Sequence, residues 1–156
     1  MDIKELETAI VTKIKEALPD LLVEAYPDHP SSFKMIHPKG AILVHYSGSR
    51  FLPSLFEEVI VQERKVSYDL ILLNRSLRSN GGIYDTMDKV REALTGFQVA
   101  VPLTSEGEDP LRTNVLPLAT KFYPLEEEFI LEENGLWQYG MRFECFTKQI
   151  EKGYEI

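Results

Sequence analysis

The dipeptide Asn134-Gly135, placed between two candidate strands, limits the fold of this chain more than any other feature. Both central residues of a type I′ turn need positive φ, and Asn followed by Gly meets that requirement well. The run after the turn, "LWQYGMRFECFTK", alternates apolar and polar side chains, and the run before it, "LATKFYPLEEEFILEEN", is the second candidate strand. The sequence therefore predicts an antiparallel β-hairpin whose second strand has one buried and one solvated face.

Two amphipathic helices are expected, far apart in the chain. The first runs from Ile3 to Leu18, with apolar residues at helical spacing, and Pro19 ends it. The second runs from about Gly82 to Leu94, and Gly96 stands where a C-cap glycine is expected. Each helix has one apolar stripe, which has to be buried against another element.

Three further strands are expected between the helices, in "LLVEAY", "GAILVHYSGS" and "KVSYDLILLNRS". The segment "PDHPSSFKMIHPKG" is expected to be a loop, "RFLPSLFEEVIVQERK" to be irregular at its start because of Pro53, and the stretch from Gln98 to Leu118 to be a long surface loop or a weak hairpin. Because hairpins rather than βαβ crossovers connect most strands, we predict an α+β fold. It has a single antiparallel or mixed β-sheet with two helices packed on one face, and residues 1–156 form one domain.

The charge of the chain limits its partners. Seventeen basic against twenty-five acidic residues give a formal net charge of −8, which repels nucleic acid and anionic lipid surfaces. The longest apolar runs, "AILV" and "LILL", are far shorter than the roughly 20 residues of a spanning helix. Cys145 is the single cysteine, and Met1 leads directly into a charged helix, as is typical of a cytosolic chain. We expect no specific nucleic-acid binding and no membrane insertion.

The turn before the second helix, formed by Ser79, Asn80, Gly81 and Gly82, raises the question of phosphate binding. A phosphate loop also needs several convergent glycines and usually a lysine at the helix start, and the chain has neither there. These residues can instead cap the first amides of the helix and supply an unrestricted φ. The turn is predicted to be structural.

Other candidates for chemistry lack a recognisable arrangement. His29, His37 and His45 are eight residues apart, without a cysteine partner or helical pairing, so no metal site is predicted. Cys145 lies on an apolar-patterned face, which indicates a buried, inert thiol. The carboxylate runs, Glu57–Glu58, Glu126–Glu128 and Glu132–Glu133, could supply an acid and a base but are more typical of solvated strand edges and ends. We expect no enzyme and no cofactor.

One segment favours an interaction surface. Large apolar side chains follow each other in a connection between two strands, where water would ordinarily surround them, and an arginine precedes them: Arg50, Phe51, Leu52, Leu55 and Phe56. Exposed groups of this kind mark contact surfaces. The alternative is that the connection folds back onto its own core. A second loop raises the same question with Arg75, Leu77 and Arg78.

Three stretches of the chain resemble a known family: "HPKGAILVHYSGS", "YDLILLNRSLRSNGGIYDTMDKVREALTGF" and "FILEENGLWQYGMRFECFT". They look like the small tail-terminator-like proteins of Mu-like phages and prophages. The similar positions are a glycine-led strand, an arginine-and-leucine turn, a G-x-Y helix start and an L-x-G-F end, here Gly40–Tyr46, Arg75, Leu77, Gly82–Tyr84 and Leu94–Phe97. The resemblance extends from about Ile3 to Thr147 and includes no catalytic motif.

This resemblance implies a structural protein of the virion tail, made in the host cytoplasm, that caps the end of the tail tube as a ring and prepares the tail for head or neck joining. The implied partners are copies of the chain itself, expected as a hexamer, the tail tube protein, and a head or neck protein. Two alternatives remain: a neck or head-tail connector adaptor, and a small enzyme or ligand-binding module that uses surface carboxylates.

Overall fold

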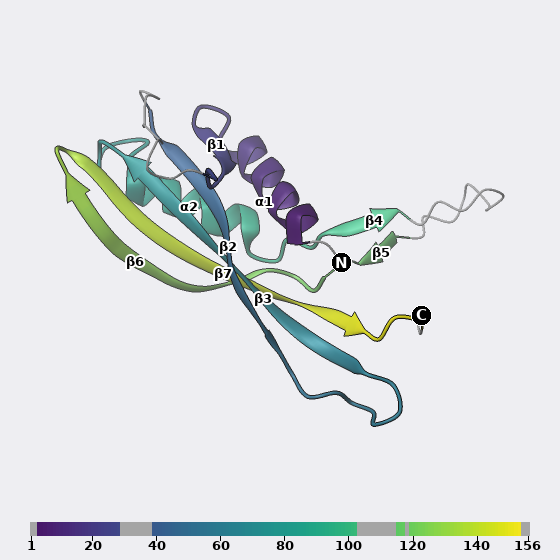
Figure 1. The fold of residues 1–156 in the computed structure, drawn as a ribbon. Helices are drawn as coiled ribbons and strands as arrows, with labels where there is room; N and C mark the ends of the chain where they lie inside the picture. The colour runs from purple at the N-terminus through teal and green to yellow at the C-terminus, as the bar shows by residue number, and fades with distance from the viewer. Residues whose placement is uncertain (1–2, 29–38, 103–114, 118, 154–156) are drawn as a thin grey trace.

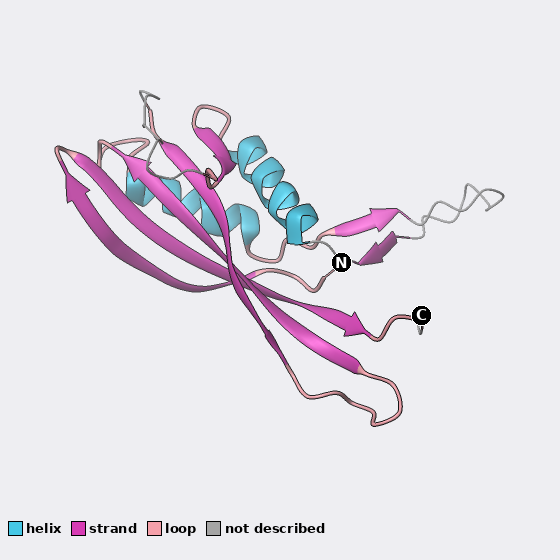
Figure 2. Cartoon of the chain, in the orientation of Figure 1, coloured by secondary structure: helices cyan, strands magenta, loops and turns pink. Residues whose placement is uncertain are grey.

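The described part of the chain folds into two helices, one large sheet and one small ribbon (Figures 1 and 2). The structure, a computed structural model, describes residues 3–28, 39–102, 115–117 and 119–153. The elements in chain order are α1 (Ile3–Ala17), β1 (Leu22–Ala25), β2 (Ala41–Phe51), β3 (Val61–Asn74), α2 (Ile83–Leu94), β4 (Ala100–Pro102), β5 (Val115–Pro117), β6 (Tyr123–Glu133) and β7 (Leu136–Ile150).

The large sheet has five strands in the order β1-β2-β3-β7-β6. Strands β2, β3, β7 and β6 pair antiparallel, whereas β1 pairs parallel with β2. The sequence predicted either an antiparallel or a mixed sheet, and the sheet is mixed. A parallel pair needs a long crossover connection, and residues 26–40 supply it. Most of the predicted loop in this stretch, including His29 and His37, lies outside the described residues.

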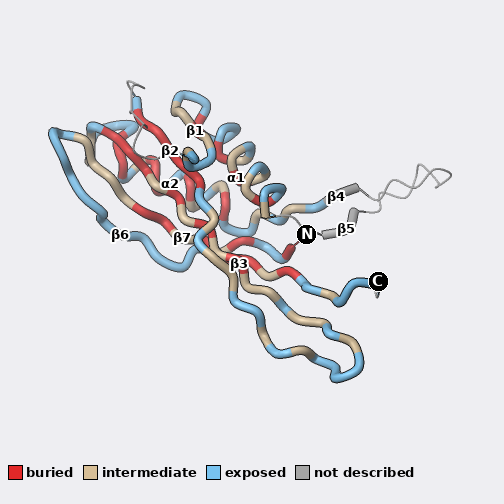
Figure 3. Tube along the Cα trace, in the orientation of Figure 1, coloured by how far each residue is buried: buried red, intermediate tan, exposed pale blue. Residues whose placement is uncertain are grey.

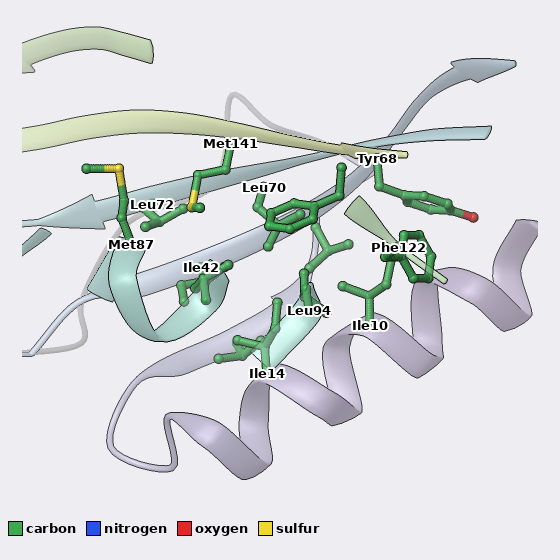
Figure 4. Close-up of a cluster of buried hydrophobic side chains, with 14 of the residues drawn as sticks. Ile10, Ile14, Ile42, Tyr68, Leu70, Leu72, Met87, Leu94, Phe122 and Met141 are labelled. Carbon is green, nitrogen blue, oxygen red and sulfur yellow. The ribbon is translucent and has the colours of Figure 1, made fainter. Parts of the chain in front are cut away.

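Both helices cover the same face of the sheet, as the sequence predicted. Leu6, Ile10 and Ile14 of α1 are fully buried, and they share one core with the α2 stripe. Figure 4 shows Ile10 and Ile14 of α1 on the side of the sheet where residues of the central strands point, among them Ile42, Leu70 and Met141. Successive residues of a strand point to opposite faces, so every second residue of β2, β3 and β7 faces the helices and contributes to this core.

The centre of the sheet extends past the helices as a long hairpin, which we call the arm (residues 47–65) (Figure 1). None of these residues is buried, and Figure 3 shows this part of the molecule exposed or half-buried throughout. The sequence predicted that β2 would end near Ser49 and that β3 would begin near Lys65. The ladder instead continues to Phe51 paired with Arg64, because main-chain bonds do not require a buried face.

The predicted turns have the backbone conformations that their residues favour. Asn134 and Gly135 have φ values of 53° and 80°, and they join β6 to β7 as expected for the hairpin. The second helix ends at Leu94, and Gly96 takes a φ of 83° just beyond it. In the stretch from Gln98 to Leu118, β4 and β5 pair antiparallel, which agrees with the weak hairpin; residues 103–114 and 118 lie outside the described residues.

Candidate functional site

The tip of the arm presents large apolar side chains to solvent. The exposed fractions are 48% for Phe51, 68% for Leu55, 60% for Phe56 and 42% for Ile60, while Leu52 is half-buried. We call these five residues the arm tip. The connection does not fold back onto the core, so the structure favours the exposed arrangement over the alternative that the sequence left open.

Hydrogen bonds hold the arm tip in one conformation. The Ser54 hydroxyl donates to the Phe56 carbonyl at 2.8 Å and accepts from the Val61 amide at 3.0 Å. The Gln62 side chain donates to the Leu52 carbonyl at 3.0 Å, and the Leu55 amide donates to the Val61 carbonyl at the same distance. Sequence reasoning missed Ser54 and Gln62, because only the folded loop brings these polar groups to their partners. The tip therefore offers an ordered apolar surface at low additional entropic cost.

Arginines flank the arm tip. The Arg64 guanidinium lies over the Phe51 ring, 5.1 Å from its centroid, and donates to the Ser49 hydroxyl at 2.9 Å. Arg50 is exposed on the neighbouring strand β2, directly opposite Lys65 of β3 in the register of the ladder. Aromatic and arginine side chains in contact are the residue types that carry most binding energy at protein interfaces.

The second predicted group, Arg75, Leu77 and Arg78, lies at the opposite end of β3 from the arm tip. A 14-residue strand is roughly 45 Å long, so the structure does not bring the two groups together. Leu77 is half-buried against the core, Arg75 is exposed, and the Arg78 guanidinium lies 5.7 Å from the centroid of the Tyr84 ring. The chain therefore has two separate candidate surfaces rather than one.

The helix-start turn is built by Asn74, which sequence reasoning did not single out. Its buried side chain donates to the carbonyls of Lys39 and Gly81 at 3.0 and 3.1 Å and accepts from the Ser76 amide at 2.9 Å. The first helix amides are bound by main-chain carbonyls: Ile83 donates to Ser76 and Tyr84 donates to Leu77.

The predicted turn residues therefore act differently from what we expected. Gly81 has a φ of 79°, as an unrestricted residue allows, and Gly82 is the N-cap. The cap has no side-chain hydrogen bond, so Ser79 and Asn80 do not cap the helix with their side chains. The loop carbonyls already occupy the amides that a cap would bind.

A cleft of about 360 Å³ beside this turn tests the enzyme alternative. It lies between the end of α1 and the start of α2, and its charged lining consists of Asp20, Lys39, Asp85 and Lys89. Asp20 lies 3.8 Å from the Lys39 ammonium group, and Asp85 accepts a hydrogen bond from the Gly81 amide. Each of the two acids thus has a partner of its own within the cleft lining.

A charged network lies on the sheet face opposite the helices. The buried carboxylate of Glu144 accepts hydrogen bonds from Ser67 and Tyr123 and lies 3.1 Å from the Lys65 ammonium group. Burial, and next the charge of Glu144, raise the pKa of Tyr123. Every oxygen of this carboxylate has a partner, so the network stabilises the sheet rather than offering a reactive group.

The remaining candidates are inert or form no site. Cys145 is fully buried, and burial raises the pKa of its thiol to about 12, so the nucleophilic thiolate is scarce at neutral pH. The His45 ring contacts the Tyr26 ring edge-on. Within the described residues, no three metal-ligating side chains gather. No described helix is long and apolar enough to cross a membrane.

The fold defines this chain as an α+β protein with a mixed five-stranded sheet and two helices on one face. A chain in the virion of a native gene transfer agent (GTA) particle has a similar structure, with a TM-score of 0.53 and 10% sequence identity; the match covers 92% of this chain and 95% of that one. The chain belongs to the Gp37 protein family, whose model matches residues 10–105. Among curated proteins, none matches this chain significantly.

Proposed function

We propose that this chain is a structural protein of a phage-type particle and that it caps the end of the tail tube as a ring. Membership of the Gp37 protein family and the likeness of its fold to a chain of a GTA virion support a role in a particle. The resemblance to tail-terminator-like proteins of Mu-like phages adds the position, at the end of the tube and facing the head or neck. Assembly would then begin in the host cytoplasm.

The exposed, ordered arm tip carries this proposal. Soluble monomers rarely expose contiguous large apolar groups without a contact function, and Leu55 and Phe56 are both more than half exposed. The acids of the cleft have separate partners, and the carboxylate of the sheet network is fully paired, so an assembly role accounts for more of the molecule than catalysis does.

The separation of the two candidate surfaces fits a closed ring. Neighbours around a rotation axis make heterologous contacts, in which two different patches of the same molecule meet. The arm tip at one end of β3 and the turn with Arg75 and Arg78 at the other are two such patches. We propose that they contact neighbouring subunits or the tube, and that the ring is a hexamer.

Two substitutions test the ring. Phe51→Asp places a charge in the arm tip, and Arg75→Glu reverses a charge in the turn. Both positions are exposed, so the monomer should stay folded by circular dichroism while light scattering shows loss of the ring. Thr12→Asp and Lys15→Glu make the same changes in charge on the exposed side of α1 and should leave assembly intact.

Unchanged assembly of both interface variants would remove the two patches from the ring contact. Purified chain that remains monomeric with and without tail tube would contradict the capping function itself. Electron microscopy of the mixture shows whether rings sit on tube ends, and rings bound to portal protein instead would indicate a connector.

A further inference from the structure

Among the strands that the structure describes, β6 forms one edge of the large sheet and pairs with β7 alone. Its other side therefore carries unpaired main-chain groups, which can accept an additional strand. The ladder with β7 shifts register between Pro124 and Glu126 and between Phe129 and Leu131, so it is unbroken over Glu126–Phe129. This edge lies outside the part of the chain that the family model matches.

A line of aromatic rings leads away from this edge, and we call it the aromatic strip (Phe129, Trp137, Tyr139 and Tyr84). The Phe129 ring lies 6.1 Å from Trp137 and 5.6 Å from Tyr139, and Tyr139 lies 6.3 Å from Tyr84. Arg78 caps the strip through its contact with Tyr84. Phe129 is 54% exposed and Tyr84 39%, and such rings are typical anchors of protein interfaces.

The charge of β6 has a single sign. The strand contains five glutamates and neither lysine nor arginine: Glu126, Glu127, Glu128, Glu132 and Glu133. Arg91 binds Glu127, and Arg142 lies 3.6 Å from Glu126, but each of these arginines also contacts an aspartate. The edge is therefore acidic while it exposes apolar side chains at Leu125, Ile130 and Leu131.

The acidic charge excludes the sheet edges of a second copy as the occupant. Two β6 strands would bring like charges together, and the opposite edge, β1, carries Glu24 between Asp20 and Asp28. Charges on an edge commonly prevent unwanted pairing. Negative charges set among exposed aromatic and aliphatic groups also favour a positively charged partner.

We propose that the β6 edge binds an extended, lysine- or arginine-rich segment of another protein, which adds to the sheet as a sixth strand along Glu126–Phe129. Basic side chains of that segment meet the glutamates, and its alternate apolar side chains cover the aromatic strip. Main-chain hydrogen bonds to β6 supply affinity, and the basic and apolar side chains of the segment supply selectivity. The site uses neither the arm tip nor Arg75, but Arg78, at the end of the aromatic strip, also belongs to the second surface of the proposed ring. Peptide binding and ring formation are therefore measured separately.

A synthetic peptide, acetyl-Lys-Val-Lys-Phe-Lys-Val-Lys-amide, tests the proposal with the full chain. Trp137 is the single tryptophan and contacts Phe129, so its fluorescence reports binding at the strip. We expect saturable binding and slower hydrogen exchange in β6. The double variant Glu128→Lys, Glu133→Lys should weaken binding at least tenfold, whereas Glu57→Lys, Glu58→Lys, with the same change in net charge at the arm, should change it less than twofold.

A second peptide, N-methylated on the main-chain nitrogens of its central phenylalanine and of the next lysine, keeps the charge but loses a ladder donor whichever side of the strand faces β6. It should bind at least tenfold more weakly. Equal binding of the two peptides, or an equal effect of the two double variants, would mean general electrostatic attraction and would overturn the proposal. So would the absence of binding at about 1 mM peptide, the weak end of specific recognition. Light scattering of the same samples reports the ring separately.

Discussion

At the scale of single residues, Asn74 connects three parts of the chain that are far apart in sequence. One amide group binds the carbonyl before β2, the carbonyl of Gly81 in the helix-start turn, and the amide of Ser76. Lys39 and Gly81 are exposed and Ser76 is half-buried, whereas the Asn74 side chain that joins them is buried. Asn74 thereby positions the turn that carries Arg75 and Arg78.

Comparing Asn74→Ala with Asn80→Ala tests whether the hydrogen bonds of the Asn74 side chain stabilise the fold more than the Asn80 side chain of the helix-start turn does. Removing the Asn74 side chain removes three hydrogen bonds of a buried group and should lower the free energy of unfolding by about 2–4 kcal/mol. Asn80 is exposed and does not cap the helix, so its replacement should change that free energy by less than about 0.5 kcal/mol. Urea denaturation measures both values, and equal losses would contradict the role of Asn74.

At the scale of elements, the sequence predicted the turns and helices that depend on neighbouring residues alone. Asn134-Gly135 specified its hairpin, and the apolar stripe of α2 gave that helix to within a residue of its start. The distal part of β3, Val61–Arg64, was missed because it has no buried face and hence no alternation that reports burial. The parallel pairing of β1 was also not specified, because strand orientation depends on the path of the connection.

The candidate surfaces were predictable only as separate segments. Sequence reasoning identified the apolar residues of the arm tip from their concentration in a strand connection. It raised the same question for Arg75 and Arg78 in a second loop, and only the folded strand β3 shows that the two groups lie at opposite ends of it. The aromatic strip was invisible in the sequence, since Tyr84, Phe129 and Tyr139 come from three elements and meet only in the folded sheet.

The arm should be the least protected part of the large sheet. Its ladder has the same main-chain bonds as the sheet centre but no helix above it, so local opening exposes little additional apolar surface. We expect the amides of Gln62–Lys65 to exchange hydrogen at least about 100-fold faster than those of Leu70–Leu73 in the monomeric Phe51→Asp variant. Mass spectrometry of the exchanging chain measures this ratio, and equal protection would show that the arm opens only with the core.

At the scale of the whole molecule, charge opposes the proposed assembly. Each copy carries a formal charge of −8, so a ring concentrates acidic groups, and the contacts that hold it have to exceed that repulsion. The arm tip is apolar, and apolar contacts do not weaken as simple salts screen charge. Salt screens the repulsion between copies, so the ring should become more stable as the salt concentration rises.

Raising sodium chloride from about 0.05 to 0.5 M shortens the Debye length roughly threefold and should strengthen the ring. Analytical ultracentrifugation at several protein concentrations measures the assembly constant in each condition. The complex of β6 with the basic peptide should respond oppositely and weaken, because attraction between unlike charges contributes to it. Rings that dissociate as salt rises would instead mean that ion pairs of Arg75 and Arg78 with glutamates of a neighbour outweigh the contacts of the arm tip, and charge reversal at Arg75 would then remove the salt dependence.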